Sequence, residues 1–145
     1  MIEFSTNQSD KNRQYVRRPG AYGIIRNDDN QIAVAKVDTR YFLPGGGVEG
    51  GESLEECLKR ECLEEIGAEI SVLDNFARGN CYFYSTTRNA HMESLGHFFT
   101  CQIDKILDIE SEESHELVWL DMDQAVKLLY LDNQKEAVRI IKRTN

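Results

Sequence analysis

Three glutamates near the middle of the chain, Glu61, Glu64 and Glu65, are spaced so that their side chains can meet. Residues three or four positions apart are neighbours on the surface of an α-helix, so the three carboxylates are expected to converge. Burying carboxylates without a cation costs free energy or forces them to take up protons. Their hard oxygen atoms suit Mg²⁺ or Mn²⁺ rather than Zn²⁺. The spacing therefore predicts a binding site for a divalent cation.

A short helix beginning at Ser53 is expected to position these glutamates. Ser53 is followed three residues later by Glu56, which is the pattern of a capping box at a helix N-terminus. Gly67 stands where a left-handed residue commonly caps a helix, so the last helical residue is expected near Ile66. The sequence thus predicts a helix over residues 53–66.

This helix is expected to turn some of its acidic side chains inward. At about 100° per residue, Glu61 and Glu65 fall on the apolar side and Glu64 falls at its edge. The apolar side carries Leu54, Cys57 and Leu58, and the solvent side carries Glu55, Glu56 and Lys59. The alternative is an ordinary acidic helix whose Arg60 pairs with Glu56 or Glu64. A purely structural helix would not place carboxylates on its inward side.

A cluster of glycines precedes the helix. It consists of Gly45, Gly46, Gly47, Gly50 and Gly51. Glycine lets the backbone approach a ligand closely, and the free N–H groups of a following helix N-terminus favour anions. The segment has neither the Gly-Lys-Ser/Thr of a P-loop nor the Gly-x-Gly-x-x-Gly of a dinucleotide-binding fold. The segment is therefore expected to be either a loop that approaches an anion in another way or an ordinary flexible turn.

Residues 46–68 resemble the Nudix box. The invariant positions of that pattern are occupied by Gly46, Glu52, Arg60, Glu61, Glu64, Glu65 and Gly67. The usual large apolar residues are replaced by Cys62 and Ala68, which affects packing and removes no ligand. The preceding segment 41–47 also resembles the family's approach to the box.

The resemblance implies roles for individual residues. Glu61, Glu64 and Glu65 would hold Mg²⁺ or Mn²⁺, or one of them, with Glu61 the first choice, would act as general base. Arg60 would orient the carboxylates. Glu52 would support the metal shell or the loop, the Gly46 carbonyl would complete the coordination, and Gly45 and Gly47 would line the substrate. A further carboxylate from a distal loop is expected, either Glu113 or Glu116.

The implied reaction is Mg²⁺-dependent hydrolysis of the pyrophosphate bond in a nucleoside diphosphate linked to another moiety. Tyr84, 17 residues after Gly67, lies where diadenosine polyphosphate hydrolases of the family carry a tyrosine. Nucleoside triphosphates remain an equal alternative. Two other classes stay open: a non-catalytic nucleotide-binding regulatory module, and a pyrophosphohydrolase acting on the 5′ end of RNA. A homodimer is common among similar small domains.

Length and composition indicate one domain over residues 1–145 in a reducing compartment. The hydrophobic fraction of 41% and the charged fraction of 29% are ordinary for a globular protein. A net charge of −8 disfavours duplex nucleic acid, whose binders usually have a basic face. The four cysteines form no C-x-x-C pair, and no leader or long apolar run is present. A cytoplasmic protein with no membrane partner is expected.

The remaining elements are expected to build an α/β/α sandwich around a mixed β-sheet, an α/β (α+β) fold. Residues 1–18 form either a flexible arm or an edge strand. A hairpin is expected from residues 21–26 and 31–37, joined by Asn27–Asn30. Further strands are expected at 40–43, 69–75, 80–86, 92–104 and 116–120. Capping boxes at Asp121 and Asn133 predict a helix to about Leu129 and a terminal helix.

Overall fold

The strands of the protein form two sheets, one of five strands and one of three. The computed structural model describes residues 1–107 and 115–144. The larger sheet has the order β1-β6-β7-β2-β5, with β1 (Ile2–Ser5), β6 (Ala68–Ser85), β7 (Ala90–Ile106), β2 (Val16–Ile25) and β5 (Gly45–Gly47). The smaller sheet has the order β4-β3-β8, with β4 (Arg40–Phe42), β3 (Gln31–Val37) and β8 (His115–Asp121).

The larger sheet is mixed, as expected. Strands β1 and β6 pair in parallel, as do β2 and β7, whereas β6 and β7 form a long antiparallel hairpin. The N-terminal segment therefore contributes an edge strand, which was one of the two expectations for residues 1–18. The ring of Phe4 on β1 occupies the space above Gly79, where an added Cβ would come within 2.1 Å of the ring.

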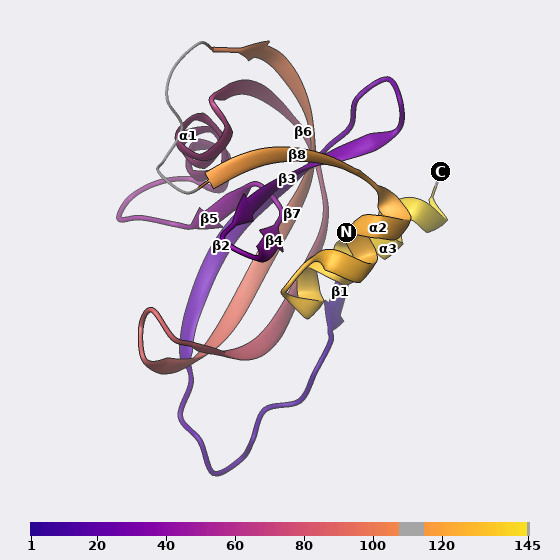
Figure 1. Cartoon of the computed structure of the whole chain (residues 1–145). Helices are drawn as coiled ribbons and strands as arrows, with labels where there is room; N and C mark the ends of the chain where they lie inside the picture. Colours follow the sequence, from indigo (N-terminus) through magenta and orange to yellow (C-terminus); the bar gives the residue numbers. More distant parts are fainter. Residues whose placement is uncertain (108–114, 145) are drawn as a thin grey trace.

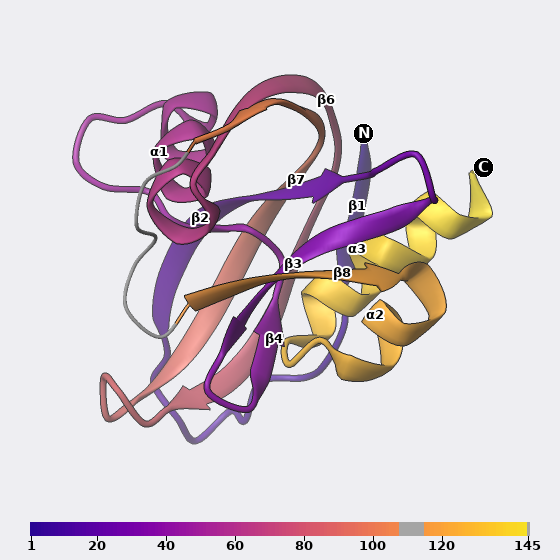
Figure 2. The ribbon, with the colours of Figure 1, turned by 45° about the horizontal axis from the view of Figure 1, so that its top comes forward.

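The helices cover both faces of the strands. Helix α1 (Leu54–Ile66) lies on one side, and α2 (Met122–Leu128) and α3 (Asp132–Arg143) lie on the other (Figures 1 and 2). One buried cluster beneath α1 contains Cys57, Leu58, Cys62, Ala21 and Phe99. The other, beneath α2 and α3, contains Ile24, Phe98, Leu129, Val138 and Ile141. These three layers confirm the predicted α/β/α arrangement.

The predicted hairpin of residues 21–26 and 31–37 is wrong in its pairing. The expected turn forms, with the Asn27 N–H donating to the Gln31 carbonyl at 3.0 Å. Beyond the single bridge between Arg26 and Ile32, the two strands enter different sheets. Residues 32–35 are fully buried on both faces of β3, so this strand packs between the two helical layers and pairs with β4 and β8.

Two further expectations need correction. The strands expected at 69–75 and 80–86 are one strand, β6, which continues through irregularities in register on either side of Asn75. The terminal helix α3 begins after Leu131 without a side-chain cap. Asn133 is instead fully buried, and its Nδ2 donates to the Gly79 carbonyl at 3.1 Å. The capping box predicted at Asp121 is present.

Candidate active site

Helix α1 has the predicted boundaries, and both of its ends are fixed. The Ser53 hydroxyl accepts from the Glu56 N–H at 3.1 Å, and the Glu56 carboxylate accepts from the Ser53 N–H at 3.0 Å. At the other end Gly67 adopts φ 63°, and its N–H donates to the Leu63 carbonyl. The helix is thereby held in one register against the sheet, which sets the direction of each acidic side chain.

The acidic side chains of α1 point as the helical period predicts. Glu65 is buried, with 7% of its surface exposed. The side chain of Glu61 is 16% exposed and that of Glu64, at the edge of the inward side, is 43% exposed. The solvent side carries Glu55, Glu56 and Lys59, all of which are exposed. Carboxylates therefore do lie on the inward side of this helix, where a metal or a cationic side chain must balance their charge.

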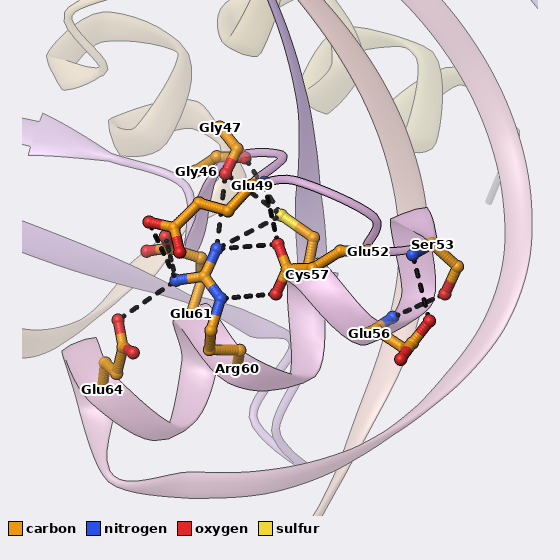
Figure 3. A network of polar contacts seen from close by, with 10 residues as sticks. All are labelled: Gly46, Gly47, Glu49, Glu52, Ser53, Glu56, Cys57, Arg60, Glu61 and Glu64. Carbon is orange, nitrogen blue, oxygen red and sulfur yellow. Dashed lines mark hydrogen bonds and ion pairs between the residues drawn. The ribbon is translucent and has the colours of Figure 1, made fainter.

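Arg60 is the centre of the polar network on this helix (Figure 3). Its guanidinium donates twice to Glu52, from Nε at 2.6 Å and from Nη2 at 3.0 Å. Its Nη1 lies 2.9 Å from Glu61 and 3.3 Å from Glu64. The hydrogen bonds to Glu52 raise the pKa of Arg60, and the same bonds lower the pKa of Glu52. One planar guanidinium thus fixes three carboxylates relative to one another.

The glycines at 45–47 form a short strand, β5, rather than the expected loop. This strand pairs antiparallel with β2, and the Gly45 N–H donates to the Glu65 carboxylate at 2.9 Å. A Cβ on Gly46 would lie 2.7 Å from the carboxyl carbon of Glu61. A Cβ on Gly47 would lie 2.1 Å from Nε of Arg18. A side chain at either position would therefore displace the end of the Glu61 or Arg18 side chain, both of which pack directly on the backbone.

Gly50 and Gly51 have a different environment from the three glycines of β5. A Cβ on either residue would meet no atom within 4 Å. Gly51 has φ +82°, so it serves the turn that leads into α1. These two glycines shape the chain and make no close approach to the acidic side chains.

The donor set near Arg60 is chemically suited to a hard divalent cation. The oxygens of Glu61, Glu64 and Glu65 lie on adjacent turns of α1, beside the backbone of β5. Within residues 1–107 and 115–144, however, no three carboxylate, imidazole or thiol groups lie close enough together to hold a metal ion as the side chains stand. The Arg60 guanidinium lies between Glu61 and Glu64. The Gly46 carbonyl, an expected ligand, accepts from Cys57 Sγ at 3.4 Å.

A cavity of about 320 Å³ opens beside these residues. It is lined by Gly45, Gly46, Gly47 and Glu65 on the side of the acidic helix. Its other walls include Arg18, Tyr22, Phe42, Phe83, Ser94 and Gln134. Burial raises the pKa of Tyr22 to about 12, so its phenol stays neutral at physiological pH. Glu65 and the glycine strand therefore join the acidic cluster to an open, mainly apolar binding space.

Sequence reasoning identified only part of this cavity. It predicted Gly45, Gly46, Gly47 and Glu65 as site residues. It did not identify Ser94 or Gln134, because each has polar neighbours in the sequence, Glu93 before Ser94 and Lys135 after Gln134, and so does not stand out by composition. Such a polar residue at an inward-facing position is the signal that could have revealed them.

Two expected site residues from outside the segment 45–65, Tyr84 and Glu116, are not in the cavity wall. The side chain of Tyr84 is 42% exposed and its hydroxyl bonds to Asn89. Its neighbour Phe83, on the opposite face of β6, reaches the cavity instead. Glu116 is exposed on β8 opposite Lys36, whereas the adjacent His115 lines the cavity. Glu113 lies outside the described residues.

The four cysteines are buried and form no disulfide, as expected for small core residues. Cys57, Cys62 and Cys101 belong to the core beneath α1, and Cys81 donates to the buried Asn133 at 3.2 Å. Burial raises the pKa of the Cys101 thiol to about 12. These thiols are therefore poor nucleophiles. No described helix has the length and apolar character needed to span a bilayer.

Comparisons with known proteins agree with the geometry. The chain matches the NUDIX domain over residues 16–143. The RNA pyrophosphohydrolase of Rickettsia typhi is 37% identical over 81 residues, which are 53% of this chain and 49% of that protein. The nucleoside triphosphatase NudI of Salmonella heidelberg is 40% identical over 57 residues, 35% of this chain and 40% of that protein. The chain thus spans about half the length of the curated relatives it matches.

A solved structure shows the same arrangement of elements. A NUDIX hydrolase from Nitrosomonas europaea superposes with a TM-score of 0.70, covering 88% of this chain and 90% of that one. The two sequences are 16% identical, so this likeness concerns the fold.

Proposed function

The chain belongs to the NUDIX family, and from that premise we propose that it is a pyrophosphohydrolase dependent on Mg²⁺ or Mn²⁺. Its substrate would be a nucleoside diphosphate linked to another moiety. The observation that carries the proposal is the inward placement of Glu61 and Glu65, beside a glycine strand that also lines a cavity. Acidic side chains in such a position suit a reaction at a phosphate only when a cation is present.

Different residues of the chain would bind the cation, orient the carboxylates and transfer the proton. Glu61, Glu64 and Glu65 would hold the cation, with the Gly46 carbonyl as a further oxygen ligand. When bound, Mg²⁺ or Mn²⁺ neutralises phosphate charge and makes a nearby water more acidic. Glu61 would be the proton acceptor, because Arg60 at 2.9 Å and the backbone of Gly46 fix the position of its carboxylate.

Arg60 and Arg18 would have distinct roles. Arg60 orients Glu61 and Glu64 through a guanidinium that Glu52 holds by two hydrogen bonds. Arg18 reaches the cavity beside Gly47, and its guanidinium makes no hydrogen bond or ion pair to the part of the chain that the structure describes. A cation in that position is available to pair with a phosphate of the substrate.

Nucleoside triphosphates and dinucleoside polyphosphates are the leading substrate classes. The relative named nucleoside triphosphatase supports the first, and the position of Tyr84 outside the cavity wall removes structural support for the second. The 5′ end of RNA is a second candidate, because the Rickettsia typhi relative is named for that reaction. The net charge of −8 favours a small nucleotide over a long RNA.

The proposal is tested with Glu64→Gln and Glu65→Gln in a panel of triphosphates, dinucleoside polyphosphates, nucleotide sugars and 5′-triphosphorylated RNA. Glutamine at position 65 keeps a carbonyl that accepts from the Gly45 N–H, so the fold is retained. We expect Mg²⁺-dependent turnover to fall by about two orders of magnitude or more. The matched control is Glu55→Gln, an exposed position on the same helix, which should keep wild-type turnover.

The panel also tests the alternatives. Full activity of Glu64→Gln or Glu65→Gln would overturn the proposed metal site. Failure of the wild type on every substrate with metal supplied would favour a non-catalytic nucleotide-binding module. We further propose a cytoplasmic location, supported by four free buried cysteines. We also propose that residues 1–145 form a single domain. A homodimer is a further proposal, and light scattering of the purified chain tests it by giving the oligomeric mass.

A further inference from the structure

Gln134 is a buried polar side chain in the wall of the cavity. It lies on the first turn of α3, only 1% of its surface is exposed, and it lines the same cavity as Glu65. Its Oε1 accepts a hydrogen bond from the Leu43 N–H at 2.7 Å. Leu43 lies between β4 and the glycine strand β5, so this bond ties α3 to the segment that carries the site.

The hydrogen bond to Leu43 determines which end of the Gln134 amide faces the cavity. A backbone N–H can only donate, so Oε1 must remain directed at Leu43 and Nε2 must point away from it. Within residues 1–107 and 115–144, no group accepts a hydrogen bond from Nε2. Among the described residues Nε2 is not one of the fully buried polar atoms that lack a partner, so it borders the open space of the cavity, where an atom of a ligand can accept its hydrogen bond.

The walls around this amide are suited to a flat ring. Val37, Phe42, Leu43, Phe83 and Leu131 give the cavity an apolar lining. Ser94 is a further buried polar residue in the wall, and its Oγ already accepts from Asn133 Nδ2 at 3.2 Å. A cavity of about 320 Å³ with apolar walls and a few fixed polar groups is typical of a small-molecule site.

The polar groups of the cavity follow one backbone segment. Gln134 bonds to Leu43, Glu65 bonds to Gly45, and Arg18 packs on Gly47. An extended segment of this length spans roughly 13 Å, which is comparable to the distance between the base and the terminal phosphates of a nucleotide. Phosphates held near Glu65 and Arg18 would leave the base at the Leu43 end, beside Gln134.

We propose that Gln134 makes this cavity selective for nucleobases that present a carbonyl oxygen, such as hypoxanthine, guanine and uracil, over those that present an amino group. The Gln134 Nε2 donates to the oxygen of an oxo base. Adenine or cytosine would place an N–H₂ donor against the same N–H₂ donor. This inference rests on the proposed function, because it assigns the base of the nucleotide whose phosphates lie at the acidic site.

The first experiment compares substrates that differ only in this group. The wild-type protein is assayed for kcat/KM with inosine and adenosine triphosphates, and with uridine and cytidine triphosphates. A site that hydrogen-bonds one group rejects an analogue that leaves its polar atoms unpaired. We expect the oxo member of each pair to be favoured by about tenfold or more. Equal values within both pairs would overturn the inference.

The second experiment changes the amide itself. In Gln134→Glu the carboxylate still accepts from the Leu43 N–H but loses the donor that faces the cavity. Assayed at pH 8, this variant should show no oxo preference or a preference for the amino bases. The matched control is Gln102→Glu, which makes the same chemical change at an exposed position of β7. It should keep the wild-type ratios.

A binding measurement separates this inference from the proposed function. Titration calorimetry compares inosine and adenosine monophosphates with the wild type and with Gln134→Glu. Tighter inosine monophosphate binding that is lost in the variant supports base selection even where no turnover occurs. Turnover without a base preference would leave the proposed function standing and refute the role of Gln134. Where thermal melting shows that the variant is unfolded, the wild-type substrate pairs decide.

Discussion

Replacing Arg60 by lysine tests whether the guanidinium organises the acidic side chains of α1. The substitution keeps the positive charge but replaces a planar fork of five N–H donors with a single ammonium group. Arg60 makes two hydrogen bonds to Glu52 and one each to Glu61 and Glu64. A lysine at this position can contact one or two of these carboxylates at once.

The expected magnitude follows from the bonds that are lost. Arg60→Lys loses about two charge-assisted hydrogen bonds, each contributing about 1 kcal/mol once solvent screening is allowed for. The Arg60 side chain is 24% exposed, so this screening is moderate. The free energy of unfolding should therefore fall by about 2 kcal/mol, which lowers the melting temperature of a chain of this size by about 6 °C.

The effect on turnover should be larger than the effect on stability. Once Arg60 no longer fixes Glu61 beside Gly46, kcat should fall by about 10- to 100-fold, because a small misplacement of a catalytic group is costly. The assay is Mg²⁺-dependent hydrolysis under saturating nucleotide, with thermal melting of the same samples. The matched control is Arg139→Lys, whose pairing with Glu136 at 3.4 Å is exposed. If Arg60→Lys retained both kcat and melting temperature within error, the orienting role would be refuted.

Gly46→Ala should lower kcat by about tenfold or more, because the added methyl group would lie 2.7 Å from the Glu61 carboxyl carbon. The control is Gly50→Ala, where the space is open. Equal kcat values in the two variants would contradict the prediction. The bonds to Arg60 lower the pKa of Glu52 below its ordinary value of 4.5. The ionised Glu52 side chain therefore stabilises the fold fully at pH values above 4.5, and this contribution is lost as the pH falls through the lowered pKa. Glu52→Gln should therefore flatten the acid side of the stability curve measured by urea unfolding, and an unchanged acid side would count against the pairing. Asn133→Ala should cost about 2 kcal/mol in urea unfolding, because it leaves the buried Gly79 carbonyl without the 3.1 Å donor. A cost no larger than that of Asn12→Ala, at an exposed position, would show that the bond is unimportant.

The acidic helix could be predicted from the sequence because its signals are local. The capping box at Ser53, the left-handed Gly67 and the 3.6-residue period together determine where the helix begins and ends and which side faces inward. The same period places Glu61 and Glu65 on the inward side and Glu64 at its edge, as the structure does. It could not predict Glu52 as the main partner of Arg60, because Glu52 precedes the helix.

Residues brought together by the tertiary fold were not predictable in the same way. Gln134 meets Leu43 across 91 positions of the chain. The pattern Asn133–Glu136 matches a capping box by composition, but burial of Asn133 against Gly79 and Ser94 determines its role instead. The Asn27–Asn30 turn was predicted correctly, but whether its flanking strands pair depends on the layers that cover β3.

Binding of Mn²⁺ tests the central claim most directly. Electron paramagnetic resonance of free Mn²⁺ gives the amount bound by the wild type, Glu64→Gln, Glu65→Gln and the control Glu55→Gln. The inward carboxylates predict saturable binding by the wild type and by Glu55→Gln, and weaker binding by the other two. Equal Mn²⁺ binding by all four proteins, or none by the wild type with nucleotide present, would contradict the account.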